Sequence, residues 1–164
     1  MGGEKLELAL NDFNKVIDID PNYAPSYNGR GLVWDRFFKF DEAIKDFTKA
    51  ILIDSKNPVY LHNRGCCFRN MGNLENSIKD FDQAIKLDDR NPIIYSNRGL
   101  VNRKLERYEL AIDDYTNEIK YSSDYQDQNS SMASKIKAYN NRAYCLAKLG
   151  RYQDAIIDYT TVIK

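Results

Sequence analysis

A five-residue stretch, Tyr-Ser-Asn-Arg-Gly at residues 95–99, recurs along this chain at a fixed interval. Related stretches lie at 61–65, at 139–143 and, in a weaker form, at 27–31. Gly31, Gly65 and Gly99 follow one another at intervals of 34 residues, and Ala143 comes 44 residues later, one period plus ten. A fixed period of this length predicts stacked structural units, each of which contacts mainly its neighbours.

Each period contains two segments with the spacing of an amphipathic helix. The second segment has apolar residues three and four positions apart, as in Leu74, Ile78, Phe81, Ala84 and Ile85. Five copies of this second helix can be recognised, and a first helix precedes four of them. The first helix carries the recurring glycine or alanine among bulky residues, so the two helices are expected to approach closely there.

This pattern resembles the tetratricopeptide repeat, with its helix–turn–helix unit and its small and aromatic residues at fixed offsets. The resemblance covers nearly the whole chain and implies an all-α fold, a right-handed α-solenoid of stacked antiparallel helix pairs. Within a single array at 1–164, the expected parts are a lone second helix at 4–19, repeats at 24–57, 58–91 and 92–121, a polar insertion loop at 122–135, and a C-terminally truncated repeat at 136–164. The third repeat departs from the pattern twice: Glu118 stands where Ala50 and Ala84 stand in earlier repeats, and Asn102 stands where Trp34 and Phe68 stand.

The composition excludes several classes of function. Lys and Arg together number 24, as do Asp and Glu, so no overall charge favours nucleic acid or an anionic membrane. No apolar run is long enough to span a bilayer, and the N-terminus lacks the apolar core of a signal peptide. Cys66, Cys67 and Cys145 have no metal-binding or redox spacing and are interpreted as reduced thiols. These features predict a cytoplasmic protein without cofactor or metal.

One arginine and one aspartate recur at constant positions in the repeats. The arginines are Arg30, Arg64, Arg98 and Arg142, and the aspartates are Asp12, Asp46, Asp80, Asp114 and Asp158. They form either a ligand-binding arginine ladder or structural pairs between helices. Recurrence in every repeat favours the structural pairs.

Asparagine recurs on the opposite face of the first helix, which lines the inner surface of such a solenoid. A carboxamide donates and accepts hydrogen bonds, and it thereby complements a peptide backbone. Basic residues lie at or beside the same face, so an acidic, extended peptide is the expected ligand. The predicted peptide-binding residues are Asn63, Asn97, Asn141, Leu100, Tyr144, Arg69, Arg103, Lys104, Lys137 and Lys148.

Other sites have less support in the sequence. Family members that clamp a terminal carboxylate use a Lys/Asn/Arg set, and the positions of His62, Cys66 and Asn141 depart from it. The only histidine, His62, has no recurring nucleophile near it, and no glycine-rich phosphate loop follows a strand. No enzymatic activity and no nucleic-acid or membrane partner are therefore predicted.

The sequence predicts a protein-interaction scaffold that holds a peptide or partner segment in the concave groove of a tetratricopeptide superhelix. Two alternatives remain open at this point. The array could be an architectural segment of a large assembly that stacks through its open ends, either by end-to-end self-association or as part of a longer repeat chain. It could also be the substrate-recruiting module of a larger enzyme.

Overall fold

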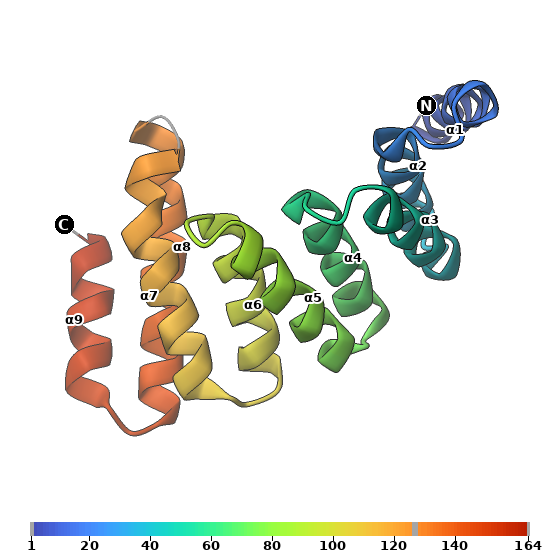
Figure 1. The fold of residues 1–164 in the computed structure, drawn as a ribbon. Helices are drawn as coiled ribbons and strands as arrows, with labels where there is room; N and C mark the ends of the chain where they lie inside the picture. The colour runs from blue at the N-terminus through green and yellow to red at the C-terminus, as the bar shows by residue number, and fades with distance from the viewer. Residues whose placement is uncertain (1, 126–127, 164) are drawn as a thin grey trace. The chain divides into compact units, whose positions relative to one another are not determined.

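The computed structural model describes residues 2–125 and 128–163, and all regular secondary structure in these ranges is α-helical (Figure 1). The predicted all-α fold of antiparallel helix pairs is confirmed. The helices are α1 (Gly2–Ile19), α2 (Ala24–Arg36), α3 (Phe40–Ile53), α4 (Pro58–Met71), α5 (Leu74–Leu87), α6 (Pro92–Lys104), α7 (Tyr108–Tyr125), α8 (Gln128–Lys148) and α9 (Tyr152–Ile163).

The helices form two compact units, 1–87 and 88–164, which are described separately. In the first unit α1 packs on α2, α2 on α3, α3 on α4 and α4 on α5, and the two first helices α2 and α4 also touch. In the second unit α6 packs on α7, α7 on α8 and α8 on α9. Within each unit the helices therefore pack mainly on their neighbours in the chain, as expected for stacked repeats.

Local sequence signals set the helix boundaries. Asn57 and Asn91 precede α4 and α6, and their side-chain oxygens accept hydrogen bonds from the backbone N–H groups of Val59 (3.0 Å) and Ile93 (3.1 Å). A proline follows each of these caps, at a position where its missing N–H leaves no helical bond unmade. Together the two signals start both helices.

The turn inside each helix pair requires a left-handed backbone conformation. Gly72 and Gly150 adopt it with φ of 85° and 75°. At the same position the other two pairs have Phe38 (φ 59°) and Glu106 (φ 57°), which lack the conformational freedom of glycine. The turn geometry is thus conserved between the pairs even where the residue is unfavourable.

The recurring glycine allows the two helices of a pair to touch. A Cβ atom on Gly65 would lie 2.9 Å from Cε1 of Phe81, closer than real Cβ contacts. Phe81 is fully buried, like its counterparts Phe47 and Tyr115. In the last pair alanine replaces glycine, and the corresponding aromatic residue, Tyr159, is exposed.

The predicted loop at 122–135 is wrong where the structure describes it, because 122–125 belong to α7 and 128–135 to α8. Residues 126–127 lie outside the described ranges. Serine hydroxyls explain the difference: Ser122 donates to the backbone oxygen of Glu118 (2.6 Å), one turn earlier, and its Oγ lies 3.4 Å from that of Ser134. Ser122 and Ser131 are buried. A polar sequence can therefore continue both helices, since its small side chains pack closely and make their hydrogen bonds locally.

Candidate partner-binding site

The recurring arginine and aspartate form the same bidentate pair in each repeat. Arg64, for example, donates from Nε to Oδ2 of Asp80 (2.8 Å) and from Nη2 to Oδ1 (2.7 Å). The equivalent pairs are Arg30–Asp46, Arg98–Asp114 and Arg142–Asp158. The four aspartates are buried. These pairs confirm the structural interpretation of the arginine positions.

In three of the repeats a third hydrogen bond ties the arginine to the preceding second helix. Nη1 of Arg30 donates to Asn14 (2.7 Å), that of Arg64 to Thr48 (3.0 Å) and that of Arg142 to Thr116 (3.0 Å). Each of these guanidinium groups therefore holds three helices together, the first helix that carries it and the second helices on either side.

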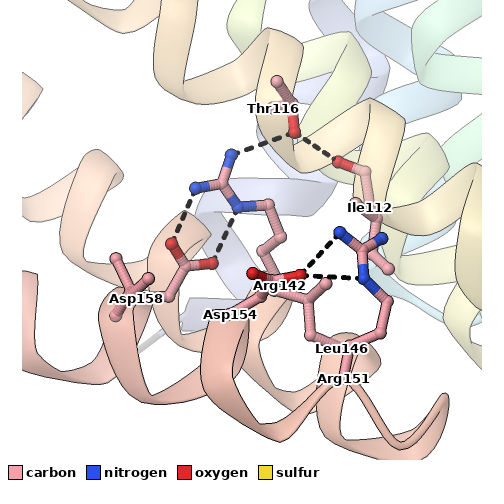
Figure 2. Close-up of a pocket in the computed structure, with 8 residues that line it drawn as sticks. Ile112, Thr116, Arg142, Leu146, Arg151, Asp154 and Asp158 are labelled. Carbon is pink, nitrogen blue, oxygen red and sulfur yellow. Dashed lines mark hydrogen bonds and ion pairs between the residues drawn. The ribbon is translucent and has the colours of Figure 1, made fainter.

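A pocket of about 280 Å³ lies in the second unit where α7, α8 and α9 meet (Figure 2). Its charged lining residues already pair with one another, Arg142 with Asp158 and Arg151 with Asp154 (2.7 Å each). Ile112, Leu146 and Ile157 supply apolar parts of the wall. The pocket thus belongs to the seam between repeats, and its polar groups are committed to the scaffold.

The predicted asparagine row has different partners in the two units. In the first unit Asn63 donates to Asn28 Oδ1 at 2.8 Å, which joins α4 to α2. Sequence analysis missed Asn28 because Gly29 occupies the position equivalent to Asn63. In the second unit Asn97 donates to the backbone oxygen of Ile93 on its own helix (2.9 Å).

Four predicted residues of the second unit come together on the first helices α6 and α8. Arg103 Nη1 donates to Asn141 Oδ1 at 2.9 Å, and the Arg103 guanidinium lies over the Tyr144 ring, 5.4 Å from its centre. Lys148 Nζ lies 5.5 Å from the centre of the same ring. Tyr144 is 41% exposed. We call Arg103, Asn141, Tyr144 and Lys148 the α6–α8 cluster.

The remaining predicted residues lie around or apart from this cluster. Leu100 is half-buried on α6, while Lys104 and Lys137 are exposed on α6 and α8. Arg69, half-buried near the end of α4, belongs with Asn63 to the first unit. The predicted set is therefore divided between two units, and its interacting core is the α6–α8 cluster.

The two departures in the third repeat are both buried polar groups. Asn102 donates from Nδ2 to Asp114 Oδ2 (2.8 Å) and adds a bond to the carboxylate that Arg98 holds. Glu118 lies between α6 and α8 and accepts a hydrogen bond from Ser134. The break in the repeat pattern was the signal that marked both positions.

The described residues offer little for catalysis or metal binding. His62 Nε2 lies 3.6 Å from Cys66 Sγ, its ring packs on Phe81, and burial lowers the pKa of the imidazole. In 2–125 and 128–163 there is no group of three or more His, Cys, Asp or Glu residues that could hold a metal ion. Across the same ranges, none of the helices combines the length and apolar character needed to cross a membrane.

Comparisons with known families and with solved structures agree on the type of fold. The family described as TPR repeat matches residues 67–106, and the family described as tetratricopeptide repeat matches residues 136–164. The comparison with curated proteins gives no match.

Three solved structures illustrate the likeness. That of MamA is 18% identical, covers 99% of this chain and 89% of its own, and has a TM-score of 0.85. PilF from Pseudomonas aeruginosa is 20% identical over 99% and 69%, with a TM-score of 0.81. YrrB, described as a TPR protein with an unusual peptide-binding site, is 17% identical over 99% and 78%, with a TM-score of 0.76. At these identities the likeness shows a shared fold.

Proposed function

The chain is a tetratricopeptide-repeat protein, and on that premise we propose that it binds an acidic, extended segment of a partner protein along the first-helix face of its second unit. Helical repeats of this type are typically protein-interaction scaffolds. The observation that carries the proposal is the exposed Tyr144 ring with the cations of Arg103 and Lys148 over it.

The chemistry of the α6–α8 cluster suits a carboxylate-bearing segment. The electron-rich face of the Tyr144 ring favours the nearby positions of both cations. Arginine has five N–H donors, of which Asn141 accepts one, and a guanidinium can grip a carboxylate with two parallel bonds. Exposed Lys104 lies next to Arg103 in the sequence of α6 and adds positive charge, which raises the association rate for an acidic partner.

The asparagines have different roles in this proposal from the uniform ladder expected at first. Asn141 directs its oxygen to Arg103, and its buried Nδ2 makes no hydrogen bond among the described residues. We assign it the role of a positioning residue that orients the guanidinium. Asn97 remains a candidate contact for the peptide backbone. The similar structure of YrrB, described as having a peptide-binding site, supports peptide binding by this fold.

The proposal includes no catalytic activity, because repeats of this family are generally non-catalytic scaffolds. It also keeps the cytoplasmic location predicted from the sequence. The three cysteines support that location, since all of them are free thiols.

An array of short acidic peptides and their basic counterparts of equal hydrophobicity tests the proposal. The unmodified chain should bind acidic peptides, and the affinity should fall as salt is added. Tyr144→Ala combined with Lys148→Ala should weaken binding about tenfold or more at an unchanged melting temperature. Tyr152→Ala with Lys86→Ala removes the same two residue types from exposed positions of second helices and is the matched control. Equal binding by both double variants would contradict the proposal.

A second candidate function is architectural, with the outer face of α9 serving as a stacking surface for a second copy. Three large apolar residues at helical spacing are exposed there: Tyr152, Ile156 and Tyr159. The equivalent face of α7 is covered, since Ala111 and Tyr115 pack on Cys145 of α8. If copies associate this way, sedimentation should show concentration-dependent dimers that Ile156→Glu abolishes. A monomer at all concentrations would exclude this candidate.

A further inference from the structure

Glu118 is a buried carboxyl group at a position where the earlier repeats have alanine. Ala50, Ala84 and Glu118 follow one another at the 34-residue period, and both alanines are fully buried. Glu118 is 2% exposed although its side chain is larger and ionisable. A charged carboxylate in such surroundings is costly unless it is well paired.

Among the residues that the structure describes, its surroundings supply hydroxyl groups and no ion pair. Ser134 of α8 donates to Glu118 Oε1 at 3.3 Å, and Ser96 of α6 also counteracts the rise in the pKa of the carboxyl. The other oxygen, Oε2, is buried and has no hydrogen-bond partner among the described residues. Only one of the two carboxylate oxygens therefore has a hydrogen-bond partner among the described residues.

The charged and titratable groups around Glu118 come from its own helix and from the two helices packed on it. Lys137 of α8 is the cation that acts on it, and this lysine is itself exposed. On α7, Tyr115 lies one turn earlier, and burial raises the pKa of its hydroxyl, so it stays neutral. The group on the α6 side, Ser96, is uncharged. An exposed, solvated lysine compensates only weakly for burial.

We propose that the protonation state of Glu118 controls the stability of the contact between α7 and the N-terminal half of α8, which makes the second unit a pH-responsive element. A protonated carboxyl is a donor as well as an acceptor, so it can both donate to and accept from the hydroxyl of Ser134, 3.3 Å from Oε1. Because α8 also carries Asn141, Tyr144 and Lys148, the same contact supports the helix that presents the α6–α8 cluster. The inference stands whether or not that cluster binds a peptide.

The direction of the pH effect follows from linkage. Burial raises the pKa of Glu118 from 4.5 to about 7, against the opposing effects of Ser96, Ser134 and Lys137. Between pH 4.5 and about pH 7, Glu118 therefore carries a proton in the folded chain that it has released in the unfolded chain. The contribution of Glu118 to stability is therefore largest in acid, falls as the pH rises from 4.5 through about 7, and is constant above that.

The test compares denaturant unfolding of the full chain with that of Glu118→Gln at several pH values between 5 and 8. The glutamine stays neutral, so the ratio of the two unfolding constants isolates Glu118. This ratio should change on the order of 100-fold over that range. Glu109→Gln, an exposed change on the same helix, is the control and should follow the parent chain. A ratio for Glu118→Gln that is independent of pH would overturn the proposal.

A second measurement needs no variant that must fold. The carboxyl carbon resonance of Glu118 in the native chain should titrate near pH 7, and amide exchange in 118–125 and 131–138 should speed up above that pH. A midpoint at the ordinary value for glutamate, or exchange in these segments that follows only the intrinsic chemical rate, would reject the inference.

Discussion

Arg142 and Asp158 lie sixteen residues apart and form two parallel hydrogen bonds, from Nε to Oδ2 at 2.8 Å and from Nη2 to Oδ1 at 2.7 Å. The same separation joins Arg30 to Asp46, Arg64 to Asp80 and Arg98 to Asp114. The insertion of ten residues leaves the spacing unchanged because it lies between helix pairs. The pair is thus a feature of the single repeat, while its third hydrogen bond, to Thr116 in the case of Arg142, joins one repeat to the next.

Replacing the arginine alone should leave a buried negative charge without a partner. Arg64→Met is expected to lower the free energy of unfolding by about 3 kcal/mol, since Asp80 stays buried. Denaturant unfolding measures the change. Combining Arg64→Met with Asp80→Asn removes the charge and should recover part of the loss. Lys15→Met, at an exposed pair with Asp12, should change the free energy by less than about 0.5 kcal/mol.

The close helix contact at Gly65 should not tolerate a methyl group. Gly65→Ala would place Cβ 2.9 Å from the buried Phe81 ring and 3.3 Å from Asp80 Cβ, so the helices must separate or the ring must shift. The expected loss is about 1–3 kcal/mol in unfolding free energy, reduced by the better helix propensity of alanine. Gly3→Ala is the control, because an added Cβ there would meet no atom within 4 Å beyond its chain neighbours and the local helix backbone. Equal effects of the two changes would contradict the packing argument.

The turn between α6 and α7 should be improved by glycine. Glu106 has a φ of 57°, a left-handed conformation that costs a residue with a side chain about 1–2 kcal/mol. A glycine at this position would avoid that cost, although its greater conformational freedom in the unfolded chain offsets part of the gain in stability. Glu106→Gly is therefore expected to raise the thermal midpoint, and Gly150→Ala, the reverse change at the equivalent turn, to lower it. Shifts of the same sign would disprove the explanation.

The cysteines should react slowly while the chain is folded. Burial raises the pKa of Cys67 to about 12 and those of Cys66 and Cys145 to about 11, so little reactive thiolate exists at pH 8. For a shift from 9 to 11 the thiolate fraction falls about 100-fold. Mass spectrometry after iodoacetamide treatment should find alkylation mainly in denaturant. Rapid alkylation of Cys67 in the native chain would show that the packing of α4 on Ala43 and Phe47 of α3 does not bury it.

Residues that act within one repeat could be predicted well. The glycine beside Phe81 and the pairing of Arg64 with Asp80 follow from positions that recur with the period, because each repeat solves the same packing problem. The same logic failed at residues 122–135, where polar composition suggested a loop. There Ser122 is buried and donates a hydrogen bond to the preceding turn of its own helix. Its burial could not be predicted, because it depends on which helix packs against it.

The candidate site shows the same division. The period placed Asn141, Tyr144 and Lys148 on one helix face, as their spacing of three and four residues requires. It did not predict that Arg103 would bond to Asn141 and lie over Tyr144, because α6 and α8 belong to repeats separated by the insertion. It also missed Asn28, the partner of Asn63, which lies one position away from the repeat register.

By itself, the sequence determined the helix pairs, their order and the arginine–aspartate pairs within each repeat, since a 34-residue period specifies side chains that meet at constant separations. The tertiary structure alone decided which polar residues are buried and which side chains from different repeats meet. Glu118 is the clearest case: as a glutamate in an amphipathic helix it could face solvent, but the alanine position it occupies lies between α6 and α8. Burial depends on what packs against a residue, and a linear pattern does not contain that information.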